Sequence, residues 1–268
     1  MTPKLLLAVT LLALPAWIRA ETADTQQLKP LSDVRISMQR MLRSSEGRYF
    51  LSLYAGVWNP HASLYDRVEQ SETKLKGRQK ADQLTLKSVD ADGVENGQYQ
   101  LTGTLNSNTG QLKALLLAAN RPVQQSVEFE PAIKVSNKPN FIFKFYGAEK
   151  INQPDSAALK KIDIINKDNN TVTQSLVGFN AFAKSIGYMD INFDGYYDII
   201  LSDISQARTI KDKRYIYWIY NPKTQYFQRS PQLENIVGFP NLHGEKQQID
   251  FGNGQLYQVE NGLLNRMN

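Results

Sequence analysis

Short runs of alternating hydrophobic and polar residues, separated by turn-forming residues, recur along the chain. In the first half these runs occupy residues 49–58, 74–90, 98–105 and 111–119. Turn signals stand between them, at residues 90–93, 96–97 and 108–110. A period of two is typical of strands with one buried face, and Asn-Gly and Asp-Gly favour hairpins. The first half therefore predicts an antiparallel meander of short strands.

The same spacing continues after a predicted linker at residues 136–140, where Lys138-Pro139 interrupts any regular element. The strand-like segments after this linker are residues 141–147, a hairpin over 161–177 with its tip at 167–170, residues 198–204, a hairpin over 214–230 that turns at 221–224, and residues 256–262. Turn signals every ten residues or so are typical of a sandwich, a barrel or a propeller-like sheet. We therefore expect an all-β fold of antiparallel strands, distorted propeller-like or sandwich, with no regular repeat.

Two domains are predicted from this pattern: an N-terminal β-rich meander region, residues 21–135, and a C-terminal β domain, residues 136–268. Residues 33–43 leave two readings open, a short helix capped by Ser32 or Asp33, or a strand over 34–38. Residues 215–220, YIYWIY, carry aromatic side chains on both faces of a strand. We expect core packing there; an exposed face would be an interaction surface.

The N-terminus has the pattern of a secretory signal peptide. Lys4 precedes an apolar stretch over residues 5–17, and Ala20 supplies a small residue at a cleavage site. The alternative reading is a core helix. The stretch is too short for a typical membrane span, and no later segment is long and apolar enough to be one. The sequence predicts cleavage near Ala20 (signal peptide 1–20) and a soluble periplasmic or secreted protein without a transmembrane segment.

Composition narrows the class of protein. With 41% hydrophobic and 21% charged residues over 268 positions, the chain is ordinary globular material. It has no cysteine, which excludes disulfides, thiolate metal sites, a cysteine nucleophile and a lipidated N-terminal cysteine. An exported chain without disulfides favours the bacterial periplasm over a eukaryotic extracellular setting. Its stability must then come from core packing or from a bound ion.

Charge adds little. The net charge is +5, and loss of Lys4 and Arg19 with the signal leaves 29 basic and 26 acidic residues, or +3. Two clusters of basic residues are expected to lie on solvated faces of strands or helices. They are Arg35, Arg40, Arg43 and Arg48, and Lys74, Lys76, Arg78 and Lys80. No nucleic-acid recognition motif is present, so we expect no nucleic-acid partner. An anionic polymer of the cell envelope remains open as a ligand.

The densest acidic segment is residues 190–198, DINFDGYYD, between two strand-like stretches. Carboxylates this close repel one another, which raises the pKa of each, and a bound hard divalent cation removes the repulsion. Calcium takes six to eight oxygen ligands, and glycine at the sixth position permits the tight turn. The predicted Ca²⁺ ligands are the side chains of Asp190, Asn192, Asp194 and Asp198 and the carbonyl of Tyr196.

An EF-hand shares the first six positions of this segment but needs glutamate at the twelfth, where this chain has Leu201. The flanks are also strand-like rather than helical. The simpler alternative is an Asx-rich hairpin turn, although a turn does not require an acid at the ninth position. Residues 90–93, DADG, lack that acid and the third ligand, and are expected to be a plain turn.

The loop and the segments around it resemble a family of bacterial periplasmic proteins. The resemblance covers residues 141–236 and rests on the D-x-N-x-D-G-x-x-D loop together with the aromatic hairpin YIYWIYNPKTQYF. The loop alone is shared with integrin-type (FG-GAP, VCBS) repeats. Family members are similar to periplasmic inhibitors of i-type lysozyme, which implies an all-β, propeller-like fold with one calcium. The Ser-Gly-x-Tyr segment of such inhibitors is absent, and Ser45–Tyr49 is only loosely similar.

Catalytic signals are weak, and no enzyme activity is expected. His61 and His243 have no zinc-ligand spacing and are expected at the surface. Nucleophile-elbow, phosphate-loop and dinucleotide motifs do not occur. Two functions from different classes stay open. One is an exported calcium-binding protein that inhibits a lysozyme-like peptidoglycan hydrolase. The other is a calcium-stabilised envelope module that binds peptidoglycan or another glycan, or assists envelope assembly, without inhibiting any hydrolase.

Overall fold

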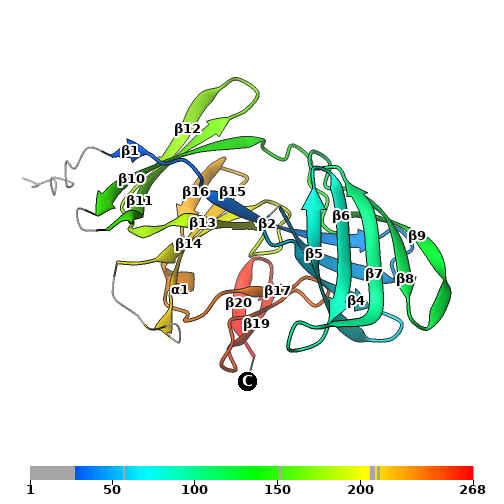
Figure 1. Ribbon diagram of the computed structural model, residues 1–268. Coiled ribbons are helices and arrows are strands. Elements are labelled where there is room, and N and C mark those ends of the chain that lie inside the picture. The colour runs from blue at the N-terminus through cyan, green and yellow to red at the C-terminus, as the bar shows by residue number, and fades with distance from the viewer. Residues whose placement is uncertain (1–27, 57, 151–152, 206–208, 210–211, 268) are drawn as a thin grey trace, which may run out of the picture.

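The computed structural model describes residues 28–56, 58–150, 153–205, 209 and 212–267, and they form an almost entirely antiparallel β structure (Figure 1). This confirms the predicted all-β class. The single helix among these residues is one turn long, α1 (Pro231–Glu234). No helix in these ranges is long and apolar enough to cross a membrane. The predicted signal peptide, residues 1–20, lies outside the described residues.

Eight strands of the first half close into a barrel, seen at the right of Figure 1. In chain order they are β2 (Arg35–Ser44), β3 (Tyr49–Ala55), β4 (His61–Asp66), β5 (Ser71–Lys80), β6 (Gln83–Val89), β7 (Glu95–Leu105), β8 (Leu112–Ala118) and β9 (Arg121–Pro131). The last strand closes the barrel by pairing with the first, with Leu42 opposite Pro131 and Ser44 opposite Phe129. Closure removes the free edges of an open sheet.

Alternation along the barrel strands turns one set of side chains inward. On β8, Leu112, Ala114 and Leu116 are buried, whereas Leu115 and Leu117 face outward. Leucines from the other strands join them, and Tyr49 and Phe129 are the largest side chains of this core. An eight-stranded barrel is just wide enough for side chains to fill it. The interior of this barrel is accordingly a hydrophobic core, in which each fully buried leucine contributes about 1.5–3 kcal/mol.

Two of the predicted boundaries in the barrel are wrong. Residues 74–90 are two strands, because Ala81 takes a positive φ of 52° and turns the chain between β5 and β6. Asn96-Gly97 is no turn, since both residues lie within β7 at an irregularity in its pairing with β6. Gly97 has a φ of 70°, and Ser88 donates a hydrogen bond to the Asn96 side chain. The pair produces a bulge, which uses the same backbone freedom as a turn.

Strand β2 resolves the two readings of residues 33–43 in favour of a strand, and it is longer than expected. Its second half belongs to the barrel. Its first half runs parallel to β13 (Ala181–Met189), with Arg35 opposite Ser185 and Met38 opposite Tyr188. The predicted domain boundary at residues 135/136 stays a prediction, and β2 pairs with strands on both sides of it.

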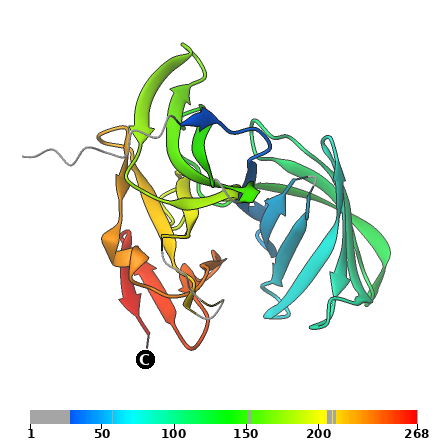
Figure 2. The ribbon, with the colours of Figure 1, turned by 60° about the vertical axis from the view of Figure 1, so that its left-hand side comes forward.

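The other described residues form three four-stranded antiparallel groups beside the barrel (Figures 1 and 2). The first is β1 (Lys29–Pro30), β10 (Phe141–Lys150), β11 (Gln153–Asn166) and β12 (Thr171–Leu176). The second is β13, β14 (Asp198–Asp203), β15 (Tyr215–Asn221) and β16 (Tyr226–Arg229). The third is a separate sheet of β17 (Asn241–His243), β18 (Gln248–Asp250), β19 (Leu256–Glu260) and β20 (Leu263–Arg266).

The aromatic strand β15 lies inside this half of the molecule. Tyr217 packs into the hydrophobic cluster next to β17–β20, whereas Ile216 and Tyr220 pack into the cluster under β11–β14. Its two faces therefore both serve the core, as the core interpretation of residues 215–220 predicted. Because β14 pairs with β15, this strand also supports the acidic segment that precedes β14.

Candidate metal centre

The acidic segment is the connection between the paired strands β13 and β14. Met189 and Asp198 lie opposite each other in the ladder, so the loop starts and ends at one fixed point of the sheet. The chain curls back on itself between them, with positive φ angles at Phe193 (55°) and Gly195 (90°). The residues of the predicted calcium loop are therefore held by a rigid hairpin base.

Asp190 organises the first part of the loop. Its Oδ1 accepts a hydrogen bond from the N–H of Asp194 at 2.9 Å, and its Oδ2 accepts one from the N–H of Gly195 at 2.7 Å. Glycine is required at position 195 for space as well as for its φ. A Cβ there would lie 2.5 Å from Cγ1 of Val135 and 2.9 Å from Cγ2 of Ile133, on the segment between β9 and β10.

Asp198, the acid at the ninth position, is fully buried. Its Oδ2 accepts a hydrogen bond from the N–H of Ile191 and its Oδ1 accepts one from the N–H of Tyr220, both at 2.9 Å. Each carboxylate oxygen has two lone-pair sites, so these bonds leave acceptor capacity toward a cation. Asp198 therefore ties the loop to β15 and keeps oxygen atoms free for a further partner.

Asn192 and Asp194 lie closer to the surface and are half-buried. The side-chain amide of Asn192 donates to Oδ2 of Asp194 at 3.0 Å, while Oδ1 of Asp194 accepts from the N–H of Tyr196 at 2.9 Å. Oδ1 of Asn192 is buried and has no hydrogen-bond partner. A buried polar atom without a partner costs about 1–3 kcal/mol, and this amide oxygen has the chemistry that calcium binds.

Burial and mutual repulsion perturb the acids. Desolvation, followed by the charge of Asp194, raises the pKa of Asp190 to about 7, although the N–H groups of Gly195 and Asp194 oppose the rise. Burial, followed by the charge of Asp190, raises the pKa of Asp198 well above its ordinary value. Negative charge in this loop is therefore undercompensated by the protein, which is the situation that a bound cation relieves.

The segment between β9 and β10 covers the loop, which the sequence did not reveal. The hydroxyl of Tyr196 donates to the carbonyl of Ser136 at 3.3 Å, and Nζ of Lys138 lies 3.6 Å from the ring centre of Tyr197. Loss of water around its ammonium lowers the pKa of Lys138 to about 8, although Asp190 opposes this and part of the side chain stays exposed. The sequence marked Lys138 only as a linker residue.

The oxygen-rich donor set, the partnerless Oδ1 of Asn192 and the buried acids fit a hard divalent cation. Across the described ranges, however, no three Asp, Glu or His side chains come together as a ready-made metal cluster. Asp190 and Asp198 point toward backbone N–H groups, and Asp194 toward Asn192 and Tyr196. Coordination by the predicted ligands would thus need the carboxylates to turn inward, while the loop backbone already has its tight curl.

The other candidate sites are less suited to chemistry. Residues 90–93 form the expected turn, in which Oδ1 of Asp90 accepts from the N–H groups of Asp92 and Val94. His61 begins β4 and stacks on Tyr54, with ring centres 4.5 Å apart. Both histidines are half-buried rather than fully at the surface as expected: the Tyr54 ring covers one side of His61, and Nδ1 of His243 lies 3.7 Å from Oε2 of Glu72.

Comparison of the chain with protein-family models and with curated proteins finds no match.

Proposed function

We propose that this chain is an exported calcium-binding protein that acts by binding a partner, and that the partner is a lysozyme-like peptidoglycan hydrolase which it inhibits. The observation that carries the calcium proposal is the loop at residues 190–198, where two buried acids and a partnerless amide oxygen share one tight hairpin connection. The sequence resemblance over residues 141–236 supports the hydrolase as target.

Calcium in this loop would act on structure rather than on chemistry. Asp190, Asn192, Asp194 and Asp198 would hold the ion, together with the Tyr196 carbonyl. Neutralising the three aspartates would stabilise the connection between β13 and β14. Through Val135 and Ser136, it would also stabilise the segment that leads from the barrel to β10. Extracellular calcium modules bind with Kd of about 10⁻⁴–10⁻³ M, which suits a role in stability.

The segment Ser45–Tyr49 is poorly suited to an inhibitory contact. This segment is the tight connection between β2 and β3, and both the N–H and Oγ of Ser45 donate to the carbonyl of Glu128 at 2.9 Å. Tyr49 is buried in the barrel, where its hydroxyl accepts a hydrogen bond from Arg121. A tyrosine held in this way cannot project into the cleft of an enzyme.

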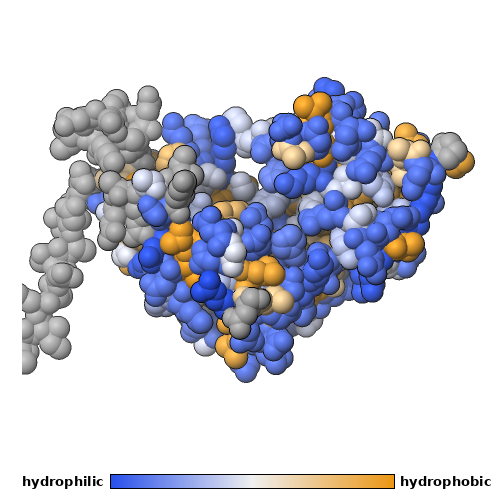
Figure 3. Space-filling view, turned by 90° about the horizontal axis from the view of Figure 1, so that it is seen from below, coloured by the Kyte–Doolittle hydropathy of each residue, from blue (hydrophilic) through white to orange (hydrophobic). Residues whose placement is uncertain are grey.

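Trp58 is a better anchor for a protein partner. It is 67% exposed, and the guanidinium of Arg35 lies 3.8 Å from its ring centre. Tryptophan and arginine are the residue types most enriched at binding hot spots. On the face shown in Figure 3, hydrophobic residues are scattered in small groups between hydrophilic ones. On that face, a broad apolar contact is therefore not the mode of binding.

A cell-wall turbidity assay tests the proposed inhibition. The mature protein, with calcium, is added in increasing ratio to i-type lysozyme acting on cell-wall suspensions, and the lytic rate should fall to a minimum at a 1:1 ratio. Trp58→Ala should weaken inhibition at least tenfold, whereas the exposed barrel substitution Leu117→Ala should not. Unchanged lysis at tenfold excess over several lysozymes would reject the hydrolase as target.

The second candidate is a calcium-stabilised envelope module that binds glycan without inhibiting a hydrolase. The locked Ser45–Tyr49 turn favours it, because the one segment similar to the inhibitors' blocking sequence is not available. This function predicts co-sedimentation with peptidoglycan or an envelope polysaccharide, with lysis unaffected.

A further inference from the structure

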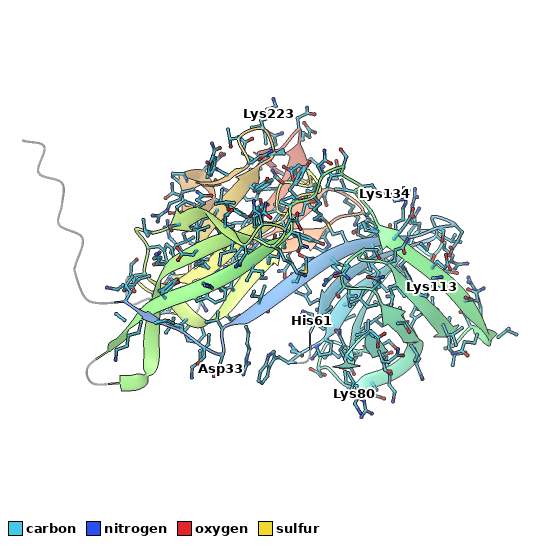
Figure 4. All side chains as sticks on the ribbon, turned by 90° about the horizontal axis from the view of Figure 1, so that it is seen from above. Asp33, His61, Lys80, Lys113, Lys134 and Lys223 are labelled. Carbon is cyan, nitrogen blue, oxygen red and sulfur yellow. The ribbon has the colours of Figure 1, made fainter. Side chains whose placement is uncertain are left out.

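A groove of about 1020 Å³ lies between the barrel and β10. Its walls come from residues 36–42 of β2, the turn at 107–111, the segment 130–143, Lys167, and Tyr188 with Tyr197. Figure 4 places Lys134, on its rim, where the barrel meets the rest of the chain. The volume is at the upper end of the range of ligand pockets.

The groove is strongly positive. Four basic residues line it: Arg40, Lys134, Lys138 and Lys167. Glu130 is the one acid among its lining residues, and Oε2 of Glu130 is already bonded to Nζ of Lys134 at 2.7 Å. Lys138 lies near Asp190 and Asp194 of the acidic loop, so Arg40 and Lys167 are the two lining cations without a nearby acid among the groove residues. The groove therefore favours a ligand that carries negative charge.

Arg40 gives this charge a focus. The sequence placed it on a solvated face, and this expectation is wrong, because Arg40 is only 7% exposed on β2. Among the described residues, none forms a hydrogen bond or an ion pair with its guanidinium. The Arg40 nitrogens are not among the fully enclosed atoms that lack a partner, so the guanidinium opens onto the groove. Partial desolvation without a carboxylate disfavours its charge, and its planar fork of donors matches a carboxylate in two parallel hydrogen bonds. Arg40 thus has the chemistry of a ligand-binding residue with its partner missing.

The remaining lining indicates which kind of anion fits. Phe141, Phe143 and Tyr197 offer aromatic surface, and the turn at residues 107–111 offers hydroxyl and amide groups for hydrogen bonds. An acidic peptide could add to a strand edge or bind through basic side chains alone. Strand β1 covers only Tyr146 and Gly147 of β10, so strand pairing does not exclude a peptide here. The aromatic wall favours a ring-shaped, hydroxyl-bearing anion, because rings pack flat on aromatic faces and flexible acidic side chains do not.

We infer that this groove binds an acidic saccharide, with the sugar carboxylate on Arg40 and the sugar rings against the aromatic wall. The inference goes beyond hydrolase inhibition and names a ligand class for the second candidate function. It does not require calcium in the loop at residues 190–198, and its failure would leave hydrolase inhibition untouched.

Titration calorimetry with tetragalacturonate tests the site on the mature protein. The matched neutral probe is the fully methyl-esterified tetramer, and tetraglutamate and inorganic phosphate are the other two probes. We expect tetragalacturonate to bind, the ester to bind at least tenfold more weakly, and neither tetraglutamate nor phosphate to compete at equal concentration. Equal binding of the ester would overturn the role of the carboxylate, and equal binding of tetraglutamate would overturn the saccharide.

Arg40→Met removes the guanidinium and keeps an unbranched side chain, and it should lower the affinity for tetragalacturonate at least tenfold. Because it removes an unpaired buried charge, its melting temperature should equal or exceed that of the wild type. Arg43→Met, on the exposed face of the same strand, is the control and should bind within twofold of the wild type. Wild-type affinity in Arg40→Met would overturn the proposal.

The exposed Lys167 provides a second variant, should Arg40→Met fail to fold. Lys167→Gln should weaken tetragalacturonate binding about threefold and flatten its salt dependence, because a long-range charge contributes less than a direct bond. Unchanged affinity in Lys167→Gln combined with Lys134→Gln would overturn the site independently of Arg40.

Discussion

The carboxylate of Asp198 accepts a hydrogen bond from the backbone N–H of Tyr220, at 2.9 Å and across 22 residues of chain. The bond joins the last residue of the acidic loop to β15, which has its two faces in two different hydrophobic clusters. The candidate metal centre is therefore anchored to a strand of the C-terminal half that packs on both of its faces. Asp198 has this structural role whether or not a cation binds.

Replacing Asp198 with alanine should destabilise the calcium-free protein. The substitution leaves the N–H groups of Ile191 and Tyr220 buried without acceptors, and each costs about 1–3 kcal/mol, while loss of the buried charge offsets part of this. We expect a net loss of at least about 2 kcal/mol in the free energy of unfolding, measured in urea with EDTA. Wild-type stability would show that these two bonds contribute nothing.

Calcium should raise the melting temperature. If the loop binds with a Kd of about 1 mM, ion at tenfold excess stabilises the native state by about 1.4 kcal/mol, or about 3–6 °C. Asp194→Ala should abolish most of this response, because Asp194 is a half-buried predicted ligand.

Asp92→Ala, in the exposed turn of residues 90–93, is the matched control and should respond like the wild type. Identical melting curves for wild-type protein in millimolar calcium and in EDTA would reject the metal centre.

Gly195→Ala should be more harmful than alanine at another positive-φ glycine. Both the φ of 90° and the Cβ position 2.5 Å from Val135 oppose a side chain, and together they should cost about 2–4 kcal/mol. Gly262 also has a positive φ, 76°, with no heavy atom within 4 Å of an added Cβ. Gly262→Ala should therefore cost only about 1–2 kcal/mol. Equal losses in urea unfolding would mean that contact with Val135 does not matter.

Stability at acid pH should depend on Asp66, which is 1% exposed at the end of β4. Burial raises its pKa, but the hydrogen bonds from Arg48 and from the N–H groups of Val68 and Glu69 outweigh burial and hold the pKa below its usual range. The shortest, from Arg48 Nη2 to Asp66 Oδ2, is 2.6 Å. A carboxyl whose pKa is lowered by folding stabilises the native state at pH values above its unfolded pKa, near 4. This stabilisation is lost as the pH falls through the folded pKa.

We therefore expect Asp66→Asn to cost about 1–3 kcal/mol at pH 7, and the difference from the wild type to shrink below about pH 4. Urea unfolding of the wild type and of Asp66→Asn, from pH 7 to below about pH 4, measures this difference in the free energy of unfolding. A difference that stays constant with pH would mean that the charge of Asp66 is not what stabilises the barrel end.

The local pattern predicted most strands because their side chains alternate between core and solvent. The hairpin tips at residues 167–170 and 221–224 and the loop between β13 and β14 all follow from turn residues and alternation within a few positions. The sequence also selected the oxygen-bearing residues of the candidate centre. The error at Asn96-Gly97 arose because a positive φ serves a turn or a bulge equally well, whereas the turn at Ala81 was missed because alanine is not a typical turn residue.

Other features required the tertiary structure. Alternation predicts which side of a strand is buried. It does not predict which strands pair, because every strand offers the same ladder of N–H and C=O groups. The closure of β9 onto β2 and the parallel pairing of β2 with β13 are such choices. They bury Arg40 beside a groove and place Val135 and Lys138 over the acidic loop. The sequence by itself determined most of the strands and the oxygen-bearing residues of the acidic loop, whereas contacts between distant segments decided which charges are left without a partner.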